Sequence, residues 1–246
     1  MIKTINNNWL KLIFRCYVFF VIVSIYAIDK PLLQDIKNFP IAGNFTLLHL
    51  LWIVLMIDML RQFFPGLKSN IGCAKQNKSK YQPPETPYQE AKLYEYTVKN
   101  NAHAIVVLMV WLGMVAVLGF LFLFGIVGGE GLLLASVFFY LCDMICVIFW
   151  CPFQHFIMKN KCCATCRIFA WDYFMIFSPL LFIPSFYTWS LLFMAIILML
   201  RWEYIHAAHP ERFWQGSNAA LHCTNCSSHC CRIKKRSKTV LEATDK

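Results

Sequence analysis

The cysteines are the residues of this chain whose spacing most clearly indicates chemistry. There are 12 of them among 246 residues, and most lie in two dense clusters at 162–166 and 223–231. Each cluster contains one pair of cysteines separated by two residues, namely Cys163 with Cys166 and Cys223 with Cys226. This spacing lets a tight turn direct both thiolates at one metal ion, and two such pairs complete a tetrahedral site.

A zinc ion shared by both pairs is the metal centre that this spacing predicts. Thiolates also hold iron-sulfur clusters, and spacing alone does not separate the two kinds of centre. An iron-sulfur cluster is therefore the alternative cofactor, although neither ferredoxin spacing is present, and thiols that bind no metal are a third alternative. The predicted ligands are Cys163, Cys166, Cys223 and Cys226, with Cys162, Cys230 and Cys231 completing a second site or replacing one ligand.

Asp143 is the second feature, because this carboxylate lies in the middle of an apolar stretch between Cys142 and Cys146. A charged side chain at the centre of a bilayer costs about 2.5 kcal/mol or more, so we expect Asp143 to face other segments. A functional role and a hydrogen-bonded structural role both fit this position. Together with Cys151, these residues also define a hypothetical route for soft metal ions toward the cysteine clusters.

Motifs of familiar enzyme classes do not occur in the sequence, which has no glycine-rich phosphate loop and no nucleophile elbow. Glu203 and His206 have the spacing that carboxylate di-iron sites use, but one such motif is insufficient. We expect Glu203 and Glu211 to form ion pairs with neighbouring arginines instead. The other expected partners are Arg61 for Asp58, and Arg167 or the first cysteine cluster for Asp172.

The composition indicates where these residues must be placed. The chain is 59% apolar and only 15% charged, whereas soluble domains are about 25% charged. The apolar residues form blocks of about 20, the length of a helix that crosses a bilayer. This pattern excludes an ordinary soluble enzyme and predicts an all-α, polytopic membrane bundle. The six predicted spans are 12–28, 45–64, 104–127, 132–153, 169–186 and 187–200.

Two parts of this bundle have distinctive sequences. The first span has Lys3, Lys11 and Arg15 at its start and no small-residue cleavage site, which predicts a retained signal-anchor. The fifth span contains Pro179 and Pro184. Because proline interrupts helices, we expect the last two spans to form a short, tilted or re-entrant hairpin.

The distribution of lysine and arginine predicts the orientation of the bundle. Of the 23 basic residues, 21 fall on one side of the predicted spans, and only Lys30 and Lys37 fall on the other. Basic residues near span ends are held on the cytoplasmic side, so both termini are predicted to be cytoplasmic in a cell inner membrane. That compartment is reducing, which favours metal binding over disulfides for the two cysteine clusters.

The formal charge of +10 has the same explanation. Basic residues next to a membrane attract anionic headgroups by about 1 kcal/mol each, so the lipid bilayer is the predicted partner rather than nucleic acid. Other membrane subunits are further predicted partners. The compact basic tail includes Arg232, Lys234 and Lys235.

These observations divide the chain into four parts. They are 1–64 with the signal-anchor and second span, 65–103 with a cytosolic loop and an amphipathic helix on the membrane surface, 104–200 with four spans and the 154–167 cysteine loop, and the basic tail 201–246. The function predicted is that of a structural or regulatory membrane subunit with a cytosolic zinc module. The alternatives are an iron-sulfur electron-transfer subunit and a transporter of soft metal ions.

Overall fold

The architecture is helical throughout the part of the chain that the computed structural model describes, residues 2–28, 40–42, 45–63, 76–160 and 166–222. A two-stranded antiparallel pair, β1 (Pro40–Ala42) and β2 (Phe45–Thr46), is the exception. The all-helical fold class predicted from the sequence is therefore confirmed. The α-helices are α1 (Ile2–Ile28), α3 (Leu47–Phe63), α4 (Glu90–Leu123), α5 (Gly129–Ile148), α6 (Asp172–Phe177) and α7 (Phe186–Ala208).

Four helices in the described residues are long and apolar enough to cross a membrane. They are Trp9–Ile28 within α1, and the whole of α4, α5 and α7. Large apolar side chains on α4, such as Ile105, Met109 and Phe120, are exposed rather than buried. Exposed apolar surface of this extent is typical of a protein that contacts lipid.

Two of the six predicted spans have a different form in the structure, so a count of six is not confirmed. Helix α3 has 17 residues, which is the lower limit of about 17 for a crossing helix. The predicted fifth span is broken into three short helices, η6 (Arg167–Trp171), α6 and η7 (Ser178–Phe182). Pro179 lies at the start of η7, where a missing N–H is tolerated.

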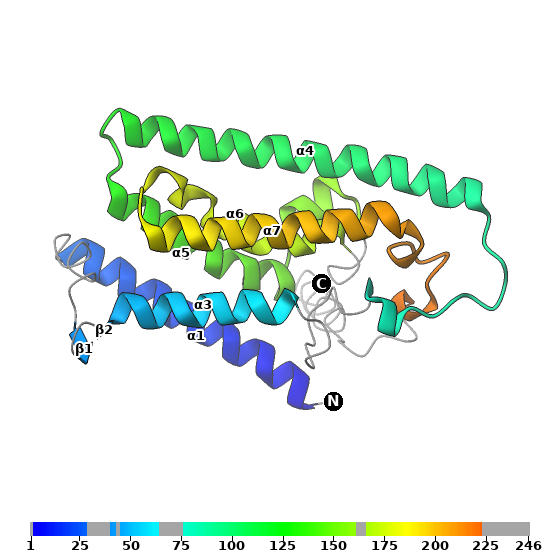
Figure 1. Cartoon of the computed structure of the whole chain (residues 1–246), viewed down its shortest axis with the longest axis horizontal. Coiled ribbons are helices and arrows are strands. Elements are labelled where there is room, and N and C mark those ends of the chain that lie inside the picture. Colours follow the sequence, from blue (N-terminus) through cyan, green and yellow to red (C-terminus); the bar gives the residue numbers. More distant parts are fainter. Residues whose placement is uncertain (1, 29–39, 43–44, 64–75, 161–165, 223–246) are drawn as a thin grey trace, which may run out of the picture.

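The helices are arranged in layers around α6 and α7 (Figure 1). Helix α4 runs along one side of the bundle, and α1 packs against α5 on the opposite side. Helix α3 packs against α7, and the broken segment from η6 to η7 contacts α4, α5 and α7. Broken backbone at membrane depth is tolerated where protein surrounds it, and this segment has such surroundings.

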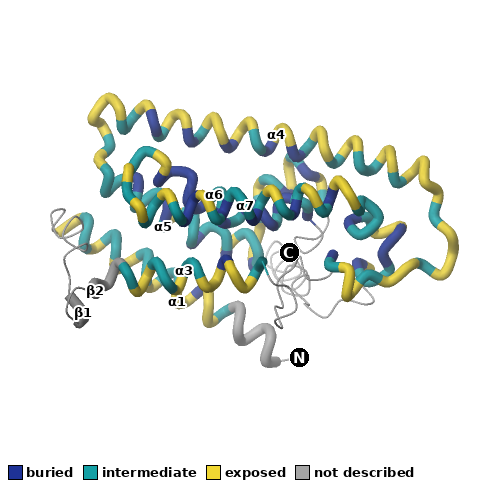
Figure 2. Tube along the Cα trace, in the orientation of Figure 1, coloured by how far each residue is buried: buried dark blue, intermediate teal, exposed yellow. Residues whose placement is uncertain are grey.

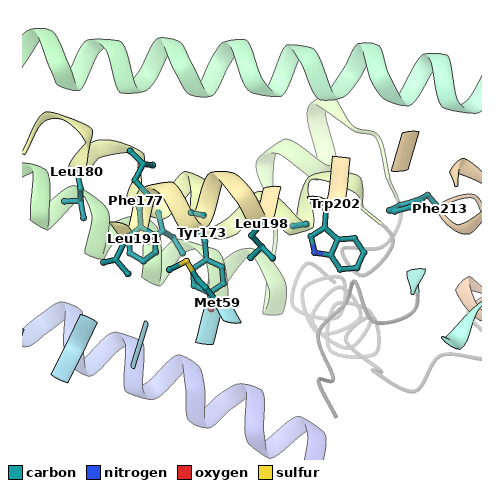
Figure 3. Close-up of a cluster of buried hydrophobic side chains, with 12 residues drawn as sticks. Met59, Tyr173, Phe177, Leu180, Leu191, Leu198, Trp202 and Phe213 are labelled. Carbon is teal, nitrogen blue, oxygen red and sulfur yellow. The ribbon is translucent and has the colours of Figure 1, made fainter. Parts of the chain in front are cut away.

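The largest cluster of buried side chains forms the centre of these layers (Figures 2 and 3). It joins α3, α6, η7, α7 and the segment that follows α7. The broken segment contributes Tyr173 and Phe177 to this cluster. The labelled members are Met59, Tyr173, Phe177, Leu180, Leu191, Leu198, Trp202 and Phe213.

Helix α4 is longer than the predicted third span, because it continues toward the N-terminus through Glu90–Leu123 without a break. The helix expected from Tyr88 to lead into the third span is thus continuous with that span in the structure, and its position on the membrane surface stays a prediction. Only a narrow stripe of α4 is buried, and it includes Val107, Trp111 and Gly119. The Trp111 indole N–H donates a hydrogen bond of 2.9 Å to the Ser178 hydroxyl.

Gly119 allows α4 to approach η7 closely, and this contact gives the first testable prediction. A methyl group at Gly119 would stand 2.3 Å from the ring of Phe182, whereas one at Gly113 would meet nothing within 4 Å. We expect Gly119→Ala to lower the free energy of unfolding by about 1 kcal/mol or more through overpacking. Gly113→Ala, the matched control, should be neutral or stabilising by up to about 1 kcal/mol. Thermal unfolding in detergent measures both, and equal stabilities would contradict the close packing.

Candidate functional site

Cys166 is the predicted metal ligand that the structure describes. The other six predicted ligands, Cys162, Cys163, Cys223, Cys226, Cys230 and Cys231, lie outside the described residues. Cys166 stands directly before η6 and is only 4% exposed. Its side chain packs in a buried cluster with Ala104, Val107 and Met158. The thiol is thus inside the bundle rather than on its surface.

A cavity of about 120 Å³ brings Cys166 together with the cysteines of α5 and of the connection that follows it. Four of the five described cysteines line it, namely Cys142, Cys146, Cys151 and Cys166. The carboxylates of Asp143 and Asp172 belong to the same wall. The rest of the lining is mainly apolar and includes Trp111, Phe139, Phe153 and Met175. The cavity therefore combines soft sulfur donors with negative charge.

Local helix geometry positions these thiols. Cys142 and Cys146 are four residues apart on α5, so they share one face of that helix. Helix α5 ends at Ile148, and the chain turns back through the π-helical turn η4 (Phe153–Ile157). Cys151 lies in that connection, where its thiol is within hydrogen-bonding contact of the Cys146 thiol.

No complete metal site exists within the described part of the chain. There, no three side chains of His, Cys, Asp or Glu are close enough together to hold one ion. A tetrahedral zinc site and an iron-sulfur cluster both require four ligands, so the described residues alone form neither. The described cysteines also form no disulfide with one another.

Asp143 has a charged partner, Arg15 on α1. An Arg15 guanidinium nitrogen lies 2.5 Å from Asp143 Oδ2 and also donates a hydrogen bond of 2.6 Å to the Tyr140 carbonyl oxygen. The guanidinium carbon lies 3.9 Å from the centre of the Tyr140 ring. The two charged side chains are 13% and 20% exposed. Asp143 therefore faces another helix, as the sequence predicts, and its ion pair joins α1 to α5.

A second group of polar side chains joins α3 to α6. The Tyr173 hydroxyl donates to Asp58 Oδ2 at 2.5 Å, in place of the ion pair with Arg61 that the sequence predicts. Asp172 accepts hydrogen bonds from the Tyr173 backbone N–H and from the Gln62 side chain, and not from Arg167 as predicted. These bonds satisfy carboxylates that would otherwise be costly inside the bundle.

Glu203 on α7 holds the segment that follows Cys166. It forms an ion pair with Arg167, and its Oε1 accepts a hydrogen bond of 2.9 Å from the Trp171 indole. Ion pairing of Glu203 with an arginine is therefore confirmed, and so is that of Glu211, which lies 3.9 Å from Arg212. His206 packs on the ring of Phe213 at 4.7 Å.

The segment after α7 lies at the end of the bundle where Cys166 and the start of α4 are found. It contains η8 (Pro210–Arg212) and η9 (Ala219–Leu221) and leads toward the second cysteine cluster. The Tyr96 hydroxyl of α4 donates to the Phe213 carbonyl oxygen at 3.4 Å, and the Ala219 N–H donates to the Gln82 carbonyl oxygen at 2.8 Å. Tyr96 also interacts electrostatically with Cys166 and Arg167.

Sequence reasoning missed two features of this site. It treated Arg15 only as a basic residue that sets orientation, although an arginine inside one span and an aspartate inside another are a signal for pairing. It also grouped Cys166 first with the tail cysteines Cys223 and Cys226, whereas the structure shows that Cys166 lines one cavity with Cys146 and Cys151. Comparison of the chain with protein families, with curated proteins and with solved structures gave no match. The function is therefore argued from the site.

Proposed function

We propose that this chain is a multi-pass membrane protein in which a thiolate metal site fastens the loop before α6 to the C-terminal tail. The ligands would be Cys163, Cys166, Cys223 and Cys226, and the metal would be zinc. In this role the protein is a structural or regulatory part of a membrane assembly. The proposed metal is closed to substrate, and its binding contributes to the folding of the segments it joins.

One observation carries this proposal: Tyr96 is linked to the surroundings of both cysteine clusters. It is close enough to Cys166, the last residue of the first cluster, to interact with it electrostatically. Its hydroxyl donates a hydrogen bond to the carbonyl oxygen of Phe213, ten residues before Cys223 in the sequence. Ten residues bridge at most about 35 Å when extended, so the second cluster is within reach of the first. The ion pair between Arg167 and Glu203 supports the same arrangement.

The basic residues support a cytoplasmic location for this end in a cell inner membrane. Arg167 and Arg201 lie here, and the sequence carries 21 of its 23 basic residues on the same side of the predicted spans. A reducing cytoplasm keeps thiols available for a metal. The anionic headgroups of the inner leaflet and other membrane subunits are the proposed partners. An alkaline phosphatase fused after Lys246 should be inactive, and an active fusion would reverse the orientation.

Metal analysis of the purified full-length protein tests the zinc site. We expect wild type to contain zinc, and Cys163→Ser and Cys223→Ser each to lose it to a similar extent, because every ligand of a closed site is needed. Cys16→Ser is the control, since Cys16 on α1 does not line the cavity. If Cys223→Ser keeps its metal while Cys163→Ser loses it, the joint site is wrong. A brown protein with visible absorption would instead identify an iron-sulfur cluster.

A second function, the handling of soft metal ions, is favoured by the cavity. Cys142, Asp143, Cys146 and Cys151 line it together with Cys166. Several sulfur donors around one cavity suit an ion that exchanges between thiolates. Conduction and transfer both require sites that bind an ion and then release it, which incomplete ligand sets provide.

A further inference from the structure

The lining of the cavity selects the kind of ligand it can take. Its volume of about 120 Å³ exceeds the space that one water molecule occupies, about 30 Å³ in liquid water. Its polar side chains are mainly thiols and two carboxylates, of which Asp143 is paired with Arg15, and its walls are otherwise mostly apolar. Thiols prefer soft metal ions to hard ones such as magnesium or calcium. A soft cation is therefore the ligand that this chemistry fits.

The number of ligands available to the cation indicates whether it is monovalent or divalent. Cys146 and Cys151 contact each other, yet no third ligand of the His, Cys, Asp or Glu type joins them within the described residues. Zinc normally takes four ligands in proteins. Monovalent copper and silver are satisfied by two sulfurs on opposite sides of the ion. Asp143 is the adjacent carboxylate, but Arg15 already holds it.

We propose that the Cys146 and Cys151 sulfurs together bind one monovalent soft metal ion, of the Cu(I) and Ag(I) class, on the wall of this cavity. Binding breaks two S–H bonds and forms two S–metal bonds, and the two protons leave to solvent. Cys166, which lines the same cavity, offers a third sulfur to which the ion can pass. This inference makes the second proposed function specific, and it does not depend on the four-cysteine zinc site.

Silver titration of the full chain tests the proposal when competing thiols are removed. The background variant carries Ser at the cysteines outside the described residues, which are Cys73, Cys162, Cys163, Cys223, Cys226, Cys230 and Cys231. It lacks three of the four proposed zinc ligands and keeps only Cys166, so failure of one proposal is distinguishable from failure of the other. We expect the background variant to bind one Ag(I) per chain in detergent under reducing conditions.

Single substitutions in this background identify the ligands. Cys146→Ser and Cys151→Ser should each weaken Ag(I) binding at least tenfold, because a two-coordinate ion loses half its ligands. Cys16→Ser should leave binding unchanged, since Cys16 lies on α1 and does not line the cavity. The proposal is overturned if Cys16→Ser weakens binding as much as the other two, or if Zn²⁺ displaces Ag(I) at comparable concentration.

A measurement on the unaltered protein covers the case in which the background variant does not fold. Each cysteine is alkylated with and without Ag(I), and mass spectrometry gives the ratio of the two rates at every position. Ag(I) should slow the alkylation of Cys146 and Cys151 at least tenfold more than that of Cys16. Equal slowing at all three positions would show that silver does not select the cavity, and the proposal would then be wrong.

Discussion

Arg15→Met should lower the free energy of unfolding by about 3 kcal/mol or more. The reason is that Asp143 would remain inside the bundle without its partner, which stands 2.5 Å away in the structure. Methionine retains an apolar side chain of similar length, so the packing of α1 against α5 is largely preserved. Thermal or denaturant unfolding in detergent measures the loss.

The double variant Arg15→Met with Asp143→Leu separates charge from packing. Replacing both members of a buried ion pair by apolar residues is often neutral, so we expect the double variant to recover most of the lost stability. Lys11→Met is the matched control, because Lys11 lies one turn earlier on the same helix and is exposed. If the double variant is as unstable as Arg15→Met alone, the ion pair does not explain the effect.

The hydrophobicity of the sequence predicts the positions of the long apolar helices well in this chain. The predicted span 104–127 lies largely within α4, and 132–153 overlaps α5 closely. It does not predict where a helix breaks or continues. Residues 169–186 are apolar enough for a span, but they form short helices surrounded by protein. The start of α4 is polar, yet the helix continues through it because no glycine or proline interrupts Glu90–Asn101.

The candidate site was predictable only where its residues are close in sequence. Helical spacing places Cys142 and Cys146 on one face, and the cost of a buried charge requires a partner for Asp143. The identity of that partner is a matter of long-range packing, since Arg15 and Asp143 are 128 residues apart. The same holds for Cys166, which reaches the cavity because η6 packs beside α4 and α7. Spacing within a motif carries no information about such contacts.

The ion pair between Glu203 and Arg167 joins α7 to the segment that follows Cys166. Removing this ion pair should make that segment less firmly held. Glu203 accepts hydrogen bonds from both Arg167 and Trp171, whose side chains are largely shielded from water. Glu203→Ala removes the acceptor of the Trp171 indole and the charged partner of Arg167, which keeps only its bond to Asn101, so we expect a loss of about 2 kcal/mol in the free energy of unfolding, discounted for partial exposure. Cys166 should also become easier to alkylate, because Arg167 follows it directly in the chain.

Glu211→Ala is the control for this prediction, because Glu211 also pairs with an arginine beside η8, but at a distance of 3.9 Å and without a tryptophan donor. A pair of this length contributes about 0 to 1 kcal/mol, so the unfolding free energy should change little and Cys166 should react at the wild-type rate. Glu203→Gln keeps an acceptor for Trp171 but loses the charge that holds Arg167. Its free energy of unfolding and its Cys166 alkylation rate should therefore lie between those of Glu203→Ala and Glu211→Ala. If Glu203→Ala and Glu211→Ala leave Cys166 equally protected, then Arg167 does not hold the first cysteine cluster in place. The zinc site proposed to join that cluster to the tail would then need a different anchor on α7.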